Sequence, residues 1–248
     1  GLSAWGRVRD WRMLQINKMP NVSLYLESDM TPETIAELGA DHVLVATGSE
    51  WLRDGTGRHF VSPCPMAEEA DVLTPDDIMA GRRPASKTVI LYDDDHYYMG
   101  GVLAELLARE DHAVSLVTPA ALASVHTKAS LEQKAIQSRL LTLGVRIIAN
   151  HALSAIARGH VTLDCVFTGA PTTCEAGSTV LVTSRRPIDG LWHALRARGI
   201  ASSRTGDCYA PGTIAAAVHA GRNFAENFGR PPADFLDLPF RREVTALS

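Results

Sequence analysis

The sequence has no apolar run near the roughly 18 residues that a membrane-spanning helix needs. Its net charge of -4 leaves no excess of Lys and Arg of the kind that marks a nucleic-acid-binding surface. The four cysteines are scattered, and none of their spacings resembles a CxxC pair or a zinc ligand set. We therefore expect a cytoplasmic, reduced protein with no membrane or nucleic-acid partner.

The N-terminus, Gly1-Leu2-Ser3, has no initiator methionine and no signal-peptide pattern. We expect the chain to be a domain fragment. Its length of 248 residues allows one large domain or two modest ones.

The most informative stretch is Asp41–Glu50, in which four apolar or β-branched residues run into Ala46-Thr47-Gly48. A short, continuously apolar run predicts a buried parallel strand, and a glycine at its end permits close approach to a ligand or another strand. A near-copy lies at Val180–Pro187. The two copies predict one sheet domain interrupted by another, with these strands at the crossing points.

Between the copies, predicted strands alternate with predicted helices, which is typical of a parallel α/β unit. We predict an α/β fold: a glutathione-reductase-like FAD/ADP domain, incomplete at its start, over residues 1–86 and 179–248, with a Rossmann-like NAD-type domain inserted at 87–178. The strands expected in the insert are Lys87–Tyr92, His112–Val117 and Val145–Ala149, its helices Val102–Arg109 and Ser130–Leu143, and its antiparallel strands Ser154–Ala157 and His160–Leu163.

Outside the insert, local signals predict several more elements. Residues 1–19 show helical spacing ended by Pro20, and Asn21–Glu27 alternates as a short strand does. A cap followed by proline predicts helices beginning at Thr31-Pro32 and Thr74-Pro75. An alanine-rich helix is expected at Thr213–Phe228.

The inserted unit lacks the dinucleotide fingerprint. A GxGxxG motif should join its first strand to its first helix, so that helix amides reach the pyrophosphate. Those positions fall near Asp93, Asp95 and Tyr98, and Gly100-Gly101 come too late to restore the motif. Thr118 stands where an acid should bind the ribose. We predict that this unit does not bind NAD(P)H.

Other candidates favour structural interpretations. Asp93-Asp94-Asp95-His96 lacks the alternating ligands of a hard-cation loop, so we expect a solvated acidic turn rather than a metal site. His193 and His219 have no obvious partner in register. Arg185-Arg186 could clamp a phosphate or form ion pairs, and Cys208 is expected to be a buried apolar residue.

Two strand-end motifs are the candidate cofactor-binding residues: Ala46-Thr47-Gly48 and Gly206-Asp207. An aspartate after a strand-end glycine can bond a ribose or ribityl hydroxyl, although Asp207 could instead be a capping or turn acid. The helix that follows could present its N-terminal amides to a phosphate or flavin edge.

Several segments, in order along nearly the whole chain, resemble the trimethylamine dehydrogenase family, which includes dimethylamine and histamine dehydrogenases and N-methylproline demethylase-like proteins, and more distantly 2,4-dienoyl-CoA reductase. The most specific segment is Gly206–Ala215, followed by Ala216–Arg222. The others are Trp5–Gln15, Val43–Ser49, Val89–Tyr92 with Tyr98-Met99, and Leu181–Trp192.

The resemblance implies a larger enzyme that oxidatively demethylates or deaminates a small amine. Its N-terminal barrel binds FMN beside a [4Fe-4S] centre, and electrons leave to an electron-transferring flavoprotein. This chain resembles the two C-terminal domains, of which the first holds ADP or FAD and the second is vestigial. Partners are therefore the parent's own FMN barrel, an electron-transferring flavoprotein and other copies in a homo-oligomer.

By this resemblance Ala46-Thr47-Gly48 and Gly206-Asp207 face the nucleotide, while Ser184 replaces a glycine expected in the second copy. We expect no catalytic residue, no metal ligand and no cofactor in this chain by itself, so that it is inactive alone. The alternatives are an NAD(P)H-dependent flavin oxidoreductase domain and a nucleotide-free scaffold that docks an electron carrier.

Because Asp93 and Asp95 stand in place of the glycines of the fingerprint, we predict no saturable binding of NADH or NADPH. Each carboxylate within about 4 Å of a phosphate charge costs on the order of 1–4 kcal/mol, depending on screening. Titration calorimetry checks this, and a dissociation constant below roughly 100 µM, about -5.5 kcal/mol, would contradict the prediction.

Overall fold

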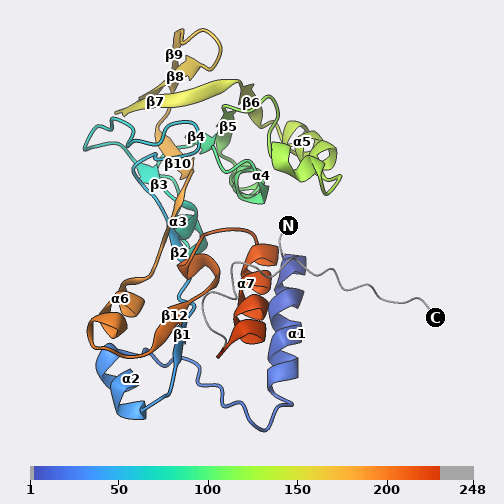
Figure 1. Ribbon diagram of the computed structural model, residues 1–248. Coiled ribbons are helices and arrows are strands. Elements are labelled where there is room, and N and C mark those ends of the chain that lie inside the picture. Colours follow the sequence, from blue (N-terminus) through green and yellow to red (C-terminus); the bar gives the residue numbers. More distant parts are fainter. Residues whose placement is uncertain (1–2, 230–248) are drawn as a thin grey trace, which may run out of the picture. The chain divides into compact units, whose positions relative to one another are not determined.

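The computed structural model describes residues 3–229, which form two compact units, each built from separate stretches of chain (Figure 1). Unit 1 comprises the chain up to Asp29 together with Glu50–Arg186. Unit 2 comprises Met30–Ser49 and the described chain from Pro187 onward. The chain therefore passes between the units at 49/50 and 186/187, outside the domain limits of 86/87 and 178/179 predicted from the sequence.

Unit 1 is organised by a five-stranded sheet in the order β3-β10-β4-β5-β6, with every pair parallel. The predicted α/β class with a parallel sheet is confirmed. The strands are β3 (Val72–Leu73), β4 (Thr88–Asp93), β5 (Ala113–Thr118), β6 (Arg146–Ala149) and β10 (Ser178–Val182).

Alternation along the strands supplies two apolar cores, one on each face. Val89 and Leu91 of β4 pack into the core beneath the helices α4 (Tyr98–Arg109) and α5 (Gln133–Thr142). Ile90 and Tyr92 pack into the core that Leu153 and Leu163 help to form. This second core lies under the antiparallel strands β7 (His151–Ala157), β8 (His160–Cys165) and β9 (Pro171–Glu175).

The helices of unit 1 begin and end at local signals. α3 (Pro75–Met79) has the predicted cap, because the Asp77 carboxylate accepts the Thr74 N–H at 2.7 Å. α4 begins at Tyr98, four residues before the predicted start at Val102. The two 3-10 turns of this unit are η1 (Ser3–Trp5) and η2 (Val125–Lys128), and η1 leads into α1 (Gly6–Ile16).

The strand predicted at Asn21–Glu27 is wrong. The structure has no strand there, and all seven residues are exposed. A period-two pattern makes a strand only where a partner strand satisfies its backbone groups, and the described chain provides no partner for this segment.

Unit 2 has a small core of its own, formed by Ile35, Val45, Leu195 and Cys208. Its strands β1 (Val43–Val45) and β12 (Ser202–Arg204) pair in parallel. Its helices are α2 (Pro32–Leu38), α6 (Gly190–Ala197) and α7 (Ile214–Asn227), with a 3-10 turn η3 (Gly206–Cys208). α2 begins at the predicted Thr31 cap and ends at Gly39, whose φ of +62° suits glycine.

The near-copy at Val180 is the main difference in topology. We expected it to return the chain to the first domain, but β10 pairs with β3 and β4 in unit 1, and the strand beside β1 is β12. The chain leaves unit 1 one strand later, through β11 (Arg185–Pro187), which pairs with β2 (Ser49–Trp51) at the crossing.

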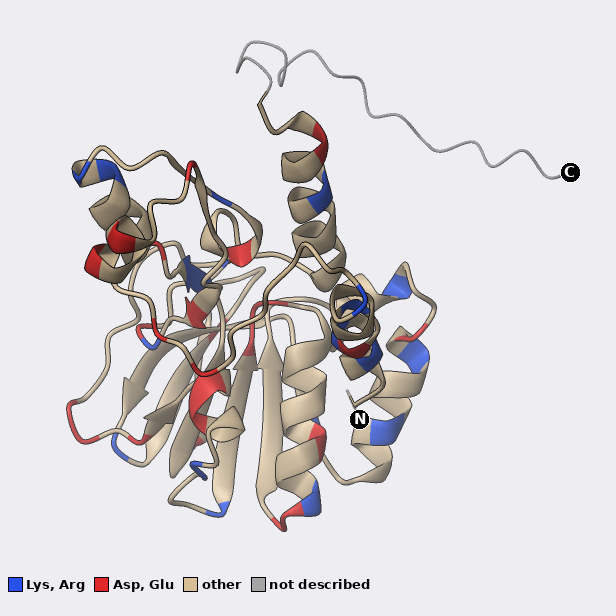
Figure 2. Ribbon diagram, turned by 90° about the horizontal axis from the view of Figure 1, so that it is seen from below, with Lys and Arg blue, Asp and Glu red and all other residues tan. Residues whose placement is uncertain are grey.

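Acidic and basic residues occur in similar numbers and are mixed along the chain. Figure 2 shows acidic and basic residues interspersed over helices and loops, while the strands are largely uncharged. Within the described residues, no helix is both long and apolar enough to cross a membrane.

Truncation of the β5 core side chain tests this fold. We expect Leu116→Ala to lower the free energy of unfolding by about 2–5 kcal/mol, because a fully buried leucine leaves a cavity. Leu141→Ala on α5, where the leucine is 57% exposed, should change it by less than about 0.5 kcal/mol. Urea denaturation followed by circular dichroism measures both, and equal effects would contradict the assigned core.

Candidate functional site

The two predicted cofactor-binding motifs follow two paired parallel strands. β1 runs into Ala46-Thr47-Gly48, and β12 runs through Thr205 into Gly206-Asp207. Because β1 and β12 are parallel and in register, both motifs lie at the same carboxyl edge, where open α/β sheets usually bind ligands. The Thr205 N–H donates to the Val45 carbonyl oxygen at 3.0 Å and continues the pairing past the strand ends.

Side chains connect the two motifs directly. The Ser49 hydroxyl donates to Asp207 Oδ2 at 3.2 Å, although 158 residues separate them. The Thr47 hydroxyl donates to the Ile188 carbonyl oxygen and lies 3.3 Å from Cys208 Sγ. These contacts place the two distant loops side by side in unit 2. Their role in binding a nucleotide stays a prediction.

Gly48 leaves room on its outer side. Its φ is +83°, in the left-handed region, and a Cβ placed there would meet no heavy atom within 4 Å. This turn is consequently open to a ligand at the strand end. Gly206 has a φ of +60°, which bends the chain from β12 into η3.

Asp207 stabilises the approach to α7. Its Oδ1 accepts the Gly212 N–H at 3.0 Å, and the Thr213 hydroxyl oxygen accepts the Ala216 N–H at 3.3 Å as the N-cap of α7. The contact with Gly212 is that of a turn acid, which is one of the two roles considered for Asp207. A carboxylate has further lone pairs, so these contacts are compatible with a ligand hydroxyl as well.

The carboxyl end of β4 differs from the expected solvated acidic turn, and that expectation is wrong. Asp93 and Asp94 are both fully buried. The loop that carries Arg58 and His59 covers this strand end. Within the described part of the chain, no group of three or more His, Cys, Asp and Glu side chains is arranged to hold a metal ion.

Asp94 is bound by the backbone of a preceding loop. Its Oδ2 accepts the Arg58 N–H at 2.6 Å and the His59 N–H at 2.9 Å, which is a backbone anion-binding concavity occupied by the protein's own carboxylate. A Cβ at Gly57 would lie 2.1 Å from that oxygen, so only glycine fits. The signal in the sequence for this contact is the glycine pair of Gly55-Thr56-Gly57.

Asp93 lies where strand β4 turns toward α4. Its Oδ1 accepts the His96 N–H at 3.0 Å, and a Cβ at Gly100 would lie 2.4 Å from its Cγ. Gly100 and Gly101 therefore have a packing function, although they do not belong to a GxGxxG motif. They let the first turn of α4 approach Asp93 at the end of β4 and Ile136 of α5. Burial raises the pKa of the Asp93 carboxyl to about 7.

His96 connects the acidic pair to the next strand. Its Nε2 lies 3.2 Å from Asp94 Oδ1, and its Nδ1 lies 3.3 Å from the Thr118 hydroxyl. Arg58 pairs with Asp95 at 3.8 Å. The region where a pyrophosphate would lie is thus filled by internal carboxylates and their partners. The geometry supports the prediction against NAD(P)H binding.

The remaining candidates have structural partners. His193 does have a carboxylate in register, Asp189 at 3.3 Å, which corrects the expectation from the sequence. Arg186 pairs with Glu50 at 2.5 Å across β2 and β11, and Arg185 lies over the Trp51 ring at 5.1 Å. Ion pairing, rather than a phosphate clamp, accounts for Arg186.

Comparison with known proteins supplies the family. Residues 73–184 match the OYE-like second alpha/beta domain, a range that includes all five strands of the unit 1 sheet except the first residue of β3. The chain is 45% identical to histamine dehydrogenase from Rhizobium sp. 4-9, covering 100% of this chain and 40% of that one with a TM-score of 0.92.

A second solved structure, the 6-hydroxypseudooxynicotine amine oxidase of Pseudomonas geniculata, is 39% identical with a TM-score of 0.88, covering 92% of this chain and 35% of that one. Dimethylamine dehydrogenase of Hyphomicrobium sp. (strain x) is 29% identical over 279 aligned positions, covering 99% of this chain and 38% of the relative.

The chain belongs to the trimethylamine dehydrogenase family. Since it spans only 35–40% of the length of these three relatives, it corresponds to one part of a trimethylamine dehydrogenase-type sequence. The family resemblance inferred from Gly206–Ala215 and the other segments is confirmed.

The buried acid of this family member predicts a pH dependence. An Asp has a pKa of about 3.9 in an unfolded chain. Because folding raises the Asp93 pKa to about 7, the native state holds its proton longer, and the free energy of unfolding falls as pH rises from about 4 to about 7. Above about pH 7 the free energy of unfolding no longer falls on account of Asp93.

Asp93→Asn keeps the acceptor for the His96 N–H but does not titrate. We expect the variant's stability advantage over the parent to grow between pH 4 and pH 7 by at least about 1 kcal/mol, measured by urea denaturation at each pH. Asp41→Asn, at an exposed position, is the control. A difference that stays constant with pH would show that Asp93 is ionised throughout.

Proposed function

We propose that this chain is the nucleotide-binding-like, C-terminal part of a flavin and iron–sulfur amine dehydrogenase that oxidatively demethylates a small amine. The single observation that carries the proposal is its 45% identity, over 100% of its length, to a histamine dehydrogenase. Two further relatives, a dimethylamine dehydrogenase and an amine oxidase, also act on amines by their names.

In this proposal the amine chemistry belongs to the rest of the parent protein. The chain spans 40% of the histamine dehydrogenase, and we assign the FMN barrel and the [4Fe-4S] centre implied by the family to the length outside it. The chain by itself is then inactive. Its contribution is to hold a nucleotide and to provide a surface for other parts of the electron-transfer system.

We assign the nucleotide, ADP or FAD, to unit 2, as a glutathione-reductase-like domain into which the other unit is inserted. The nested path of the chain supports this, since unit 2 is formed by stretches on both sides of Glu50–Arg186. The open space beside Gly48 and the paired strand ends fit such a group. A bound FAD would supply redox chemistry, whereas a bound ADP would be structural.

Within this site Asp207 would accept a hydrogen bond from a ribose or ribityl hydroxyl. The N-terminal amides of α7 would favour the phosphates, because the unpaired N–H groups and the helix dipole both attract negative charge. Ala46-Thr47-Gly48 would border the nucleotide through its backbone.

The proposed partners are the parent's own FMN barrel, an electron-transferring flavoprotein and further copies of the parent. A cytoplasmic location fits the four cysteines, all of which are free thiols.

Two alternatives make different predictions. An NAD(P)H-dependent flavin oxidoreductase domain would need a pyrophosphate site, and the buried Asp93 and Asp94 argue against one at β4. A nucleotide-free scaffold would bind none of the candidate ligands. Separate titrations with ADP, FAD, NADH and NADPH distinguish the three functions.

We expect the full-length parent protein to bind ADP or FAD saturably, and its Asp207→Asn variant to bind more weakly. Loss of a charge-assisted hydrogen bond costs about 1.5 kcal/mol, so the dissociation constant should rise roughly tenfold. The matched control is Asp41→Asn, which removes an exposed acid of the same unit and should leave binding unchanged. Equal affinities for the two variants would remove Asp207 from the site, and no binding at all would favour the scaffold.

A further inference from the structure

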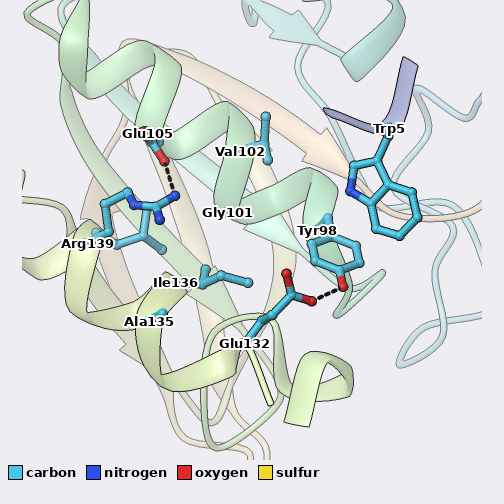
Figure 3. Close-up of a pocket in the computed structure, with 10 residues that line it drawn as sticks. Trp5, Tyr98, Gly101, Val102, Glu105, Glu132, Ala135, Ile136 and Arg139 are labelled. Carbon is cyan, nitrogen blue, oxygen red and sulfur yellow. Dashed lines mark hydrogen bonds and ion pairs between the residues drawn. The ribbon is translucent and has the colours of Figure 1, made fainter. Parts of the chain in front are cut away.

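A cavity of about 200 Å³ opens between α4 and α5 of unit 1 (Figure 3). Its aromatic wall is formed by Trp5, from the 3-10 turn η1, and Tyr98, the first residue of α4. Its floor is apolar, with Ile136 and Leu140 of α5, and carboxylates stand at its rim. No local pattern in the sequence indicates this cavity, because its walls come from three separate elements.

Trp5 and Tyr98 line the cavity side by side. The Trp5 and Tyr98 ring centroids are 5.9 Å apart, with the planes tilted by 57°. Trp5 remains 44% exposed, so part of a large aromatic surface is left for another group to cover. Aromatic faces carry partial negative charge and attract cations, and tryptophan does so best.

One carboxylate at the rim keeps its charge available. Glu132 accepts a hydrogen bond from the Tyr98 hydroxyl, which Figure 3 marks with a dashed line. That bond, with another from Ser130, lowers the Glu132 pKa and keeps the carboxylate ionised. Within the described chain the Glu132 carboxylate bonds these two hydroxyls, and no Lys or Arg there pairs with it.

The other rim charges cancel. Glu105 accepts from Arg139 at 3.2 Å and from Arg109 at 3.0 Å, and so its charge is already balanced. Arg139 is consequently engaged with Glu105 rather than free to bind an anion. The lining as a whole carries one uncompensated negative charge, that of Glu132.

The floor is apolar and closely packed. Leu140 is 1% exposed, and a Cβ at Gly101 would come within 3.0 Å of Ile136 Cγ2, so glycine allows α4 and α5 to approach closely. The cavity is smaller than the roughly 300–1,000 Å³ of sites for drug-sized ligands. It is suited to a compact ligand of a few heavy atoms.

We propose that this cavity binds a small organic ammonium ion whose apolar body rests on Ile136 and Leu140, while its charge faces Trp5, Tyr98 and Glu132. Aromatic walls beside a carboxylate are how proteins recognise alkylated ammonium groups. An anion would meet Glu132, and a neutral apolar ligand would leave the carboxylate without a counter-charge. The inference does not depend on the function proposed for unit 2.

The test is a titration of the protein with tetramethylammonium chloride at constant ionic strength, followed by the indole N–H signals of its four tryptophans in a two-dimensional nitrogen–proton spectrum. The Trp5 signal, assigned as the one lost in Trp5→Phe, should shift saturably with a dissociation constant of about 1–10 mM. Glu132→Gln should weaken binding about threefold or more. Trp5→Ala, followed through the backbone N–H signal of Gly101 in the same spectrum, should weaken it about fivefold.

Two controls make the result decisive. Trp11→Ala removes an exposed tryptophan that does not line the cavity and should leave the affinity unchanged. tert-Butanol, a neutral body of similar size, should bind much more weakly than the cation. Binding of tert-butanol as tight as that of tetramethylammonium, or an affinity unaffected by Glu132→Gln, would overturn the proposal. Unshifted signals of the other indoles show that each variant is folded.

Discussion

Burial of β10 is the constraint on which unit 1 depends. All five residues of Ser178–Val182 are buried, and the strand pairs with β3 on one side and β4 on the other. A late segment of the chain is therefore placed inside a sheet begun about 100 residues earlier, where Ser178 also donates to the Asp71 carboxylate at 2.6 Å. From β10 the chain continues through β11 into unit 2.

The end of β4 shows how a common architecture is adapted. A parallel sheet with a helix after its first strand is the arrangement that presents helix amides to a pyrophosphate. Here backbone N–H groups of the loop at Arg58 and His59 bind Asp94 instead, and the amide of His96 binds Asp93. The protein supplies its own carboxyl groups, which satisfy these donors and stabilise the loop that covers the strand end. Unit 2, by contrast, leaves the turn at Gly48 open.

The cavity between α4 and α5 and the strand-end motifs of unit 2 differ in how far they could be predicted. The motifs consist of consecutive residues at strand ends, so strand recognition alone places them at one edge once the strands are known to be parallel neighbours. The cavity requires the packing of η1 on α4, and nothing local in the sequence around Trp5 specifies that contact. The hydrogen bond from the Tyr98 hydroxyl to Glu132 likewise depends on where α5 begins.

By itself the sequence determined the elements whose signals are local: the caps at Thr31 and Thr74, the alternation of β4 with α4 and β5, and the family, through Gly206–Ala215. It could not determine strand partners, because Asn21–Glu27 and Val180–Thr183 carry ordinary strand patterns, and only tertiary contacts decide whether such a segment pairs and with which neighbour. Nor could it show that Asp93 and Asp94 are buried. Acidic residues beside a turn are usually solvated, and here burial became favourable only because a loop some 35 residues away brought the N–H groups that compensate the lost hydration.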